Sequence, residues 1–434
     1  MKKILKKIVE IVTLSLSKRI IQKYKPTVIA VTGSVGKTST KDAVFLMLKD
    51  LTKVRKSRDS LNSELGLPLA IADFKGGVNT SSVFWIKAIL KLLKILFTNF
   101  RFPEILVLEM GADQPGDLDK LLKVAPPDIG IITSVRKSHL KNFKNPSQII
   151  KEKRKLVEAI KEEGLAVLCG DDENVLKMTG KIKAKIVTYG FTKDNLIKAK
   201  NIKFDCEVKD IDKKIKCSSN FKLYSNNNFI PVRLENVLGK SQVYACLAAS
   251  AVGFHYDYNL IQIADILKKY KSPKGRLNVL KGIEKSLIID DTYNASTPLS
   301  VYVALDVLKN VKAKKRIAVL GDMLELGSQE IKSHKKIGKK IFDYADIVFT
   351  YGQAAKHITT EAKKNKKLKN KLAEHFTSRR KLIKTLKDLI DKEMAVLVKG
   401  SQGMRMEKIT KEILFNKKQA KNLLVRQSKE WLKK

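Results

Sequence analysis

The sequence of 434 residues has few cysteines and no long apolar run. Its cysteines are Cys169, Cys206, Cys217 and Cys246, and no two of them have the C-x-x-C spacing of metal or redox sites. We therefore predict neither a disulfide framework nor a zinc site, but free and mostly buried thiols. No uncharged apolar stretch reaches the length of about 18 residues that a membrane-spanning helix needs.

Acidic residues are also scarce, with 44 Asp and Glu against 87 Lys and Arg, and the formal net charge is +43. A field of that size attracts nucleic acid, anionic lipid or acidic metabolites. The excess is mostly Lys and is spread along the whole chain, without clusters of Arg and interleaved aromatic residues. This pattern favours solvated lysine-rich faces, and we expect no nucleic-acid partner.

The N-terminus begins like a signal peptide, but Lys6, Lys7 and Glu10 interrupt its apolar part and no small-residue cleavage site follows. We therefore expect a cytoplasmic protein. Residues 1–25 place isoleucines at 4, 8 and 11 on one side and lysines largely on the other, which predicts a basic amphipathic helix. The helix either packs on the domain that follows, which we favour, or lies on an anionic membrane surface such as the inner membrane face.

The central motif is VIAVTGSVGKTST at residues 28–40. A β-branched run ends at Thr32, a glycine loop follows, and helical periodicity begins at Lys37. Loop amides and a helix N-terminus in this order favour a polyphosphate, with Lys37 reaching the terminal phosphates and Thr38 holding Mg2+. Val31 stands where the strict pattern has glycine, so the loop is a shortened variant.

Two later segments, 104–113 and 127–135, read as buried strands of a parallel sheet. The first ends in Glu109, a carboxylate placed where a nucleotide-bound Mg2+ finds a second protein ligand. His139 closely follows the second. Asn62 and Glu64 precede a turn at Gly66 and Pro68, which predicts a polar loop on the substrate side.

The segment 83–97 reads as a strongly apolar helix that carries Lys87, Lys91 and Lys94 on one face. The lysines form either a solvated stripe on a helix packed against the sheet or part of a surface that binds a membrane or a partner.

Short alternating segments between residues 180 and 235 predict an antiparallel appendage, and the composition changes near 271–279. Beyond that point strands alternate with helices, which predicts a second, doubly wound α/β domain. The expected fold is α/β: a basic amphipathic helix (1–26), a P-loop domain with a mostly parallel sheet (27–272) and a Rossmann-like domain (273–434).

Seven motifs follow one another along the chain: TGSVGKTST, NSELGLP, LEMGAD, Ser-His-Leu before a Lys-rich helix, DDTYNAS, GDMLELG with a downstream His334, and KGSQGMRMEKI. In this order they resemble the Mur ligase superfamily of ATP-dependent amide-forming enzymes, and within it the MurF type, which acts on UDP-N-acetylmuramoyl-tripeptide and D-alanyl-D-alanine. The resemblance covers about residues 27–427 and implies a role in peptidoglycan synthesis, and through it in cell shape and division.

The resemblance also implies ATP and Mg2+ as cofactors. Lys37 would bind the ATP phosphates, Thr38 and Glu109 would hold one Mg2+, and His139 would help to hold a second. A lysine that is often carbamylated in this family, where it assists the second metal, matches Lys153; its neighbours Lys151 and Lys155 leave that alignment open. The other nucleotide-binding positions would be Gly33, Ser34, Gly36, Ser39, Asn62, Arg276, Asp291, Tyr293 and Asn294.

In such a ligase a carboxylate of a cell-wall precursor becomes an acyl phosphate, and an amine such as D-alanyl-D-alanine attacks it. Residues of the C-terminal domain, among them Lys399, Ser401 and Arg405, would face the amine. Two domains that close over the nucleotide would keep water from the acyl phosphate.

The sequence departs from the family in several places. DDTYNASTPLS holds one residue more than the usual spacing, and Gln402 stands where an Arg is common. Only a short helical segment precedes the P-loop, where the family has an N-terminal domain that grips UDP, so the UDP-linked substrate stays open. Ser241, Gln242 and Ala245 replace the His and two Asn of a central motif. The alternatives are a Mur-like ligase acting on a lipid-linked or non-muramoyl substrate and, in another class, a P-loop ATPase that binds nucleic acid.

Overall fold

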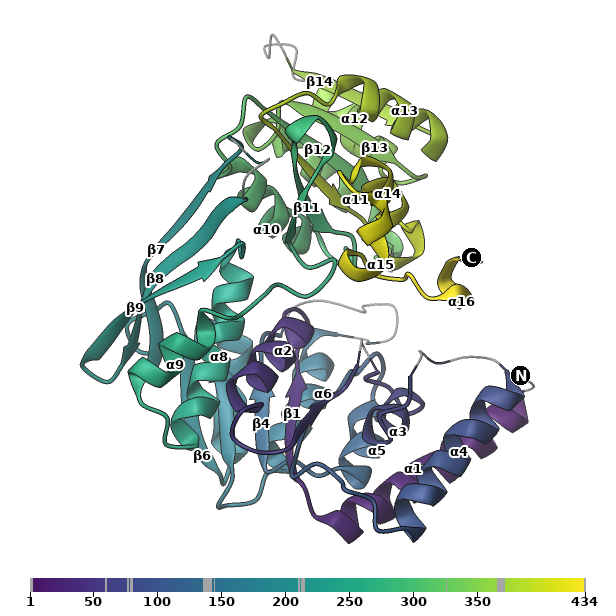
Figure 1. Ribbon diagram of the computed structural model, residues 1–434, viewed down its shortest axis with the longest axis vertical. Helices are drawn as coiled ribbons and strands as arrows, with labels where there is room; N and C mark the ends of the chain where they lie inside the picture. The colour runs from purple at the N-terminus through teal and green to yellow at the C-terminus, as the bar shows by residue number, and fades with distance from the viewer. Residues whose placement is uncertain are drawn as a thin grey trace.

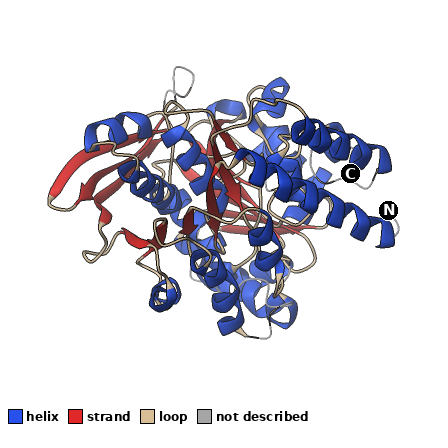
Figure 2. Cartoon of the chain, turned by 90° about the horizontal axis from the view of Figure 1, so that it is seen from below, coloured by secondary structure: helices blue, strands red, loops and turns tan. Residues whose placement is uncertain are grey.

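The computed structural model describes residues 3–58, 61–75, 78, 81–135, 143, 145–209, 211, 215–324, 326–364 and 371–432. The chain forms two α/β parts, one from the purple-to-teal half of the sequence and one from the green-to-yellow half (Figure 1). Helices lie on both sides of the strands when the molecule is seen from below (Figure 2).

The first sheet has nine strands in the order β2-β3-β1-β4-β5-β6-β7-β8-β9. Pairing is parallel from β2 to β7 and antiparallel along β7, β8 and β9. The antiparallel appendage predicted for residues 180–235 is therefore confirmed for β7 to β9, whereas β6 belongs to the parallel part of the sheet. The strands are β1 (Thr27–Thr32), β2 (Val54–Lys56), β3 (Ile105–Glu109), β4 (Ile129–Ile132), β5 (Leu165–Cys169), β6 (Lys185–Gly190), β7 (Ile197–Glu207), β8 (Lys216–Ser225) and β9 (Asn228–Glu235).

Both faces of this sheet are covered. Along β1, Val28 and Ala30 pack into one hydrophobic core while Ile29 and Val31 pack into the other, because successive side chains of a strand point to opposite faces. The first core is closed by α1 (Lys3–Tyr24), α3 (Gly66–Ile71), α4 (Ser82–Phe97), α5 (Asp117–Val124), α6 (Pro146–Glu158) and α7 (Glu173–Leu176), and the second by α2 (Lys37–Leu48), α8 (Lys240–His255) and α9 (Leu260–Leu267).

The second sheet has six strands in the order β10-β11-β15-β12-β13-β14, all parallel except β10. They are β10 (Asn278–Lys281), β11 (Leu287–Asp291), β12 (Lys315–Gly321), β13 (Ile347–Tyr351), β14 (Leu372–Phe376) and β15 (Met394–Lys399). The helices are α10 (Pro298–Lys309), α11 (Glu330–Lys340), α12 (Lys356–Lys363), α13 (Arg379–Leu389), α14 (Glu407–Ile413), α15 (Ala420–Leu423) and α16 (Lys429–Leu432). Separate cores fill its two faces, as a doubly wound sheet requires.

The ends of β7 and β8 reach from the first part to the second. Val208 donates its backbone N–H to the carbonyl of Lys312 at 3.0 Å, and Lys312 donates to the carbonyl of Cys206 at 2.8 Å. Cys206 and Cys217 also pack into a core of the second part. The two parts are therefore joined by backbone hydrogen bonds as well as by the chain.

The prediction that all four thiols are free is wrong. Cys206 and Cys217 form a disulfide, whereas Cys169 and Cys246 are free and buried. The bonded pair lies directly opposite on the antiparallel strands β7 and β8, with a Cα–Cα distance of 4.0 Å. The two cysteines are eleven residues apart in the sequence, and they meet because β7 and β8 pair in this register.

The N-terminal helix α1 packs on the domain that follows it, as favoured above, but not through its isoleucine face. Val9, Leu16 and Ile20 are buried in the core, whereas the isoleucines at 4, 8 and 11 are more than half exposed. Among the residues that the structure describes, no helix has the length and apolar character needed to cross a membrane.

The helix α4 is half buried, and its three lysines do not behave alike. Lys87 and Lys94 are exposed, whereas the Lys91 ammonium donates to the carbonyl of Asp73 at 2.7 Å. Trp85 is 1% exposed and anchors the inner side of the helix, while its neighbour Ile86 is 57% exposed.

Replacing Trp85 by Ala is expected to lower the free energy of unfolding by about 3–5 kcal/mol, because a large buried side chain leaves a cavity. The matched change Ile86→Ala should alter it by no more than about 0.5 kcal/mol. Urea unfolding of the two variants measures both values. Equal losses would contradict the burial assigned to the two sides of α4.

Candidate active site

The loop between β1 and α2 is shaped by two glycines. Gly33 has φ of +146° and Gly36 of +90°, in the range that favours glycine. A Cβ at Gly33 would also lie 1.9 Å from the Thr133 hydroxyl oxygen. Gly36 caps α2 without a side-chain hydrogen bond, so the first amides of the helix remain available to an anion.

The loop is held by the residues that follow β4. The Thr133 hydroxyl donates to the carbonyl of Val35 at 2.7 Å, and the Ser34 N–H donates to the carbonyl of Ser134 at 2.7 Å. The Lys37 ammonium donates to the carbonyl of Gly33 at 2.9 Å, which folds its side chain back over the loop. Thr133 and Ser134 were not predicted; their position directly after a parallel strand was the available signal.

Glu109, at the end of β3, joins two other predicted residues. Its carboxylate accepts hydrogen bonds from the Thr38 hydroxyl at 2.9 Å and from the Asn62 amide at 3.0 Å. Glu109 is 2% exposed, and its backbone N–H donates to the Ser57 hydroxyl at 3.1 Å. Thr38, Asn62 and Glu109 thus form one oxygen-rich cluster beside the loop, in which Thr38 and Glu109 are buried and Asn62 is half-buried. Ser39, in the first turn of α2, is buried next to it.

Lys153 is buried near Lys37, which is half-buried. Burial lowers the pKa of Lys153 to about 7; the charge of Lys37 lowers it further, whereas Asp113 and Glu152 oppose the shift. Burial is also the main cause that lowers the pKa of Lys37, with Glu109 opposing it. A substantial fraction of Lys153 is therefore a neutral amine near pH 7.

The other two candidate lysines of α6 have different surroundings. Lys151 is exposed, and Lys155 forms ion pairs with Asp119 at 2.6 Å and Glu152 at 2.7 Å. Of the three, Lys153 is the one buried beside Lys37. His139, the other predicted residue of this region, lies outside the described residues.

Arg276 brings the second part of the chain to this site. Its charge contributes to lowering the pKa of Lys37, and its guanidinium carbon lies 4.0 Å from the centre of the Tyr293 ring. Within the described part of the chain, the buried Nε of Arg276 has no hydrogen-bond partner. Arg276 is thus a cation that stacks on an aromatic ring and is close enough to Lys37 to affect its pKa.

In the second part of the chain, hydrogen bonds hold four of the predicted residues, namely Asp291, Asn294, Lys399 and Ser401. The Lys399 ammonium donates to the Asp291 carboxylate at 2.6 Å and to the carbonyl of Asn294 at 2.9 Å. The Ser401 hydroxyl donates to the carbonyl of Ala295 at 2.6 Å. These contacts fasten the loop after β15 to the loop after β11, and Lys399 and Ser401 are each 3% exposed.

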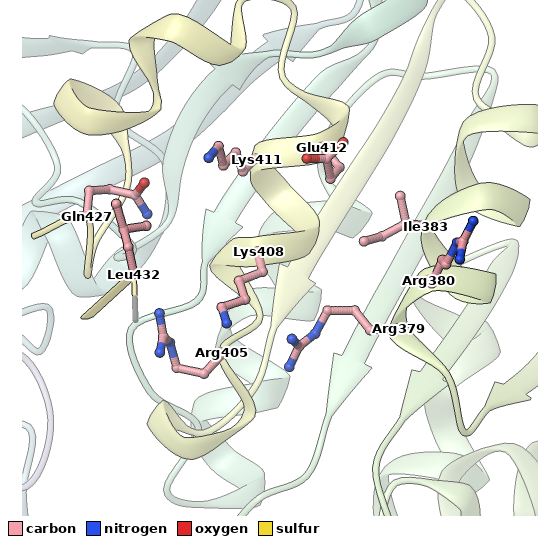
Figure 3. Close-up of a pocket in the computed structure, with 9 residues that line it drawn as sticks. All are labelled: Arg379, Arg380, Ile383, Arg405, Lys408, Lys411, Glu412, Gln427 and Leu432. Carbon is pink, nitrogen blue, oxygen red and sulfur yellow. The ribbon is translucent and has the colours of Figure 1, made fainter. Parts of the chain in front are cut away.

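Arg405 lines a basic cavity of about 610 Å³ in the second part. Figure 3 shows the charged ends of Arg379, Arg405 and Lys408 turned toward the same space. The Arg405 guanidinium also donates to Glu407 at 2.6 Å and to the carbonyl of Trp431 at 2.9 Å. The lining residues are Arg379, Arg380, Ile383, Arg405, Lys408, Lys411, Glu412, Gln427 and Leu432.

Two protein-family models match the chain. They are the Mur ligase middle domain, over residues 86–253, and the Mur ligase glutamate ligase domain, over residues 275–402. A UDP-N-acetylmuramoyl-tripeptide--D-alanyl-D-alanine ligase of Bacillus subtilis is 31% identical over 402 residues, which are 92% of this chain and 78% of that protein. The chain belongs to the Mur ligase family. A relative of the same name from Haemophilus influenzae is 27% identical over 91% of this chain and 78% of its own.

The fold of this Mur ligase is similar to that of solved structures over nearly all of the chain. MurF from Acinetobacter baumannii has a TM-score of 0.74 and 26% identity over 92% of this chain and 79% of its own. MurF from Thermotoga maritima in complex with ADP has a TM-score of 0.76 and 25% identity, with 95% and 84% covered. As a Mur ligase, the protein is an ATP-dependent enzyme that forms an amide bond.

In this Mur ligase, Gln242 has a role that the sequence did not suggest. Its amide donates to the carbonyl of Arg276 at 2.9 Å and accepts from the Tyr270 hydroxyl at 2.7 Å. The substituted position thus holds the segment that carries Arg276.

Lys153 makes the stability of this Mur ligase depend on pH. Its pKa is about 7 when folded against an ordinary value of 10.5, so the unfolded chain binds more protons between these values. In buffer free of carbon dioxide, the free energy of unfolding of the wild type, relative to Lys153→Met, should therefore rise by about 1.4 kcal/mol per pH unit above pH 7. Urea unfolding at several pH values measures this slope.

The control for that slope is Lys151→Met, which removes an exposed lysine from the same helix. Its stability should follow that of the wild type at every pH. If the free energy of unfolding of Lys153→Met also changes with pH as that of the wild type does, the lowered pKa of Lys153 would be contradicted.

Lys399→Met should lower the free energy of unfolding by about 3–5 kcal/mol, because it leaves the Asp291 carboxylate without its cation in the interior. The double variant Asp291→Asn/Lys399→Met should recover part of the loss. Denaturation of the single and double variants measures this coupling. Unchanged stability of Lys399→Met would instead favour a free ammonium that faces substrate.

Proposed function

We propose that this Mur ligase is of the MurF type and joins D-alanyl-D-alanine, or another amine, to a carboxylate of a cell-wall precursor. The observation that carries the proposal is the contact of Thr38 and Asn62 with Glu109 beside the half-buried Lys37. Relatives in Bacillus subtilis and Haemophilus influenzae that are named for the D-alanyl-D-alanine reaction support the choice of substrate. The protein would act in peptidoglycan synthesis, and so in cell shape and division.

The residues of the loop fit a nucleotide with Mg2+. The uncapped first turn of α2 fits phosphate oxygens, and the hydroxyl of Thr38 and carboxylate of Glu109 are the hard oxygen donors that Mg2+ prefers. ATP would supply the phosphoryl group that converts the substrate carboxylate to an acyl phosphate. Lys37 would stabilise the negative charge on the transferred group.

Lys153 is proposed as the carbamylated lysine. A neutral amine, but not an ammonium, adds to carbon dioxide, and the pKa of about 7 leaves about half of Lys153 neutral at pH 7. The product carries a carboxylate that would oppose the charge of Lys37 and assist a second Mg2+. His139 is proposed as its partner in holding that ion.

The second part of the chain would enclose the nucleotide and bind the amine. We propose a boundary between residues 272 and 273, with Arg276 and Tyr293 closing on the nucleotide from the C-terminal domain. The basic cavity around Arg405 and Lys408 fits the carboxylate end of a dipeptide. Asp291 and Asn294 would support that side indirectly, through Lys399.

A second candidate is a ligase that acts on a lipid-linked or non-muramoyl substrate. The exposed apolar side chains of α1 and α4 favour it, because they offer a surface to lipid.

Phosphate release from ATP and Mg2+ tests the proposal. UDP-N-acetylmuramoyl-tripeptide and D-alanyl-D-alanine together should stimulate release, while either alone should not. Lys37→Ala should lower the rate by about 100-fold or more, because a charge that stabilises the transferred group is lost. Lys49→Ala, at an exposed position just after α2, should retain the wild-type rate.

Turnover that depends on Lys37 but is not stimulated by the two substrates would overturn the MurF assignment. Lipid-linked acceptors would then be tested in the same assay.

A further inference from the structure

The helices α1 and α4 lie side by side and run in the same direction at one edge of the molecule (Figures 1 and 2). Their C-terminal ends are joined: the Lys23 ammonium donates to the carbonyl of Leu96 at 2.8 Å, and the Tyr24 hydroxyl donates to that of Ile95 at 2.8 Å. Their inner sides share one core, which includes Leu16 and Leu92. The pair is therefore a firm part of the fold.

The outward sides of these two helices are apolar, and we call them together the outer face. Its side chains recur every three or four residues over 4–11 in the N-terminal half of α1 and over 83–90 in α4, and Phe97 follows two turns later, which places them on one ridge per helix. Each is between 51% and 77% exposed: Ile4, Ile8 and Ile11 on α1, and Val83, Ile86, Leu90 and Phe97 on α4. A folded chain rarely leaves so many large apolar side chains together in water.

The outer face is also basic. Exposed cations accompany the apolar residues, namely Lys7, Lys18 and Arg19 on α1 and Lys87 and Lys94 on α4. The sequence of α4 contains no acidic residue, and that of α1 contains Glu10 alone. Glu10 lies 3.5 Å from the Lys120 ammonium of the neighbouring region, so its charge is partly neutralised.

We propose that the outer face docks on the surface of an anionic lipid bilayer. Apolar side chains flanked by lysines suit the boundary between acyl chains and charged headgroups, where burial and attraction act together. A second copy of the chain would bring the same lysines against one another, whereas an anionic surface neutralises them. This docking does not depend on which carboxylate or amine the enzyme joins.

Cosedimentation with vesicles tests the proposal. The full chain should bind vesicles of phosphatidylcholine with about one third phosphatidylglycerol, and bind pure phosphatidylcholine about tenfold less well. Ile8→Glu/Leu90→Glu should weaken binding to the anionic vesicles about tenfold or more. The matched variant Ile261→Glu/Ile331→Glu, which changes two exposed isoleucines of α9 and α11 and adds the same charge, should bind like the wild type.

Insertion has a separate readout. The tryptophan of Leu90→Trp should shift its emission to shorter wavelength when anionic vesicles are added, and brominated lipid should quench it. Thermal melting should show that the variants remain folded, because the changed side chains are exposed.

Three results would overturn the proposal. The first is failure of the wild type to bind anionic vesicles, and the second is equal loss of binding in both double glutamate variants. The third is a dimer in sedimentation velocity that Ile8→Glu/Leu90→Glu dissociates while vesicle binding is absent, because a second copy would then cover the outer face.

Discussion

The site depends on the parallel pairing of β1 with β3. Val31 is paired with Glu109, so the strand that leads into the glycine loop ends beside the strand that ends in the carboxylate. Because the carboxyl ends of parallel strands meet at one edge of a sheet, the hydroxyl of Thr38 can reach Glu109 within a hydrogen bond. The pairing of β1 with β4 adds Thr133 on the other side, where its hydroxyl supports the loop.

The burial that this packing creates also sets the chemistry of the site. Lys153 lies in the interior and Lys37 is half-buried near it, and burial without an anion destabilises the charged form of each ammonium. The arrangement is therefore poised for negative charge, whether from phosphate or from a carboxylate formed on Lys153. Arg276 adds the charge of a third cation from the second part of the chain.

Much of this organisation could be predicted from the sequence, because strand and P-loop signals are local. The order of the two α/β parts follows from apolar runs and turns, and the contact of Thr38 with Glu109 follows from strand ends. The disulfide could not be predicted, because Cys206 meets Cys217 only through the register of β7 and β8. The buried face of α1 was also hidden, since Val9, Leu16 and Ile20 are no more apolar than the isoleucines that remain outside.

The backbone bonds of Lys312 to Cys206 and Val208 have a mechanical consequence. They pin one corner where the two α/β parts meet, at the end of a hairpin that belongs to the first sheet. Any opening between the parts that keeps these bonds is therefore a rotation about that corner. In such a rotation the two parts separate most on the side away from the hairpin. A substrate would then enter between surfaces that open at an angle, and not between surfaces that move apart in parallel.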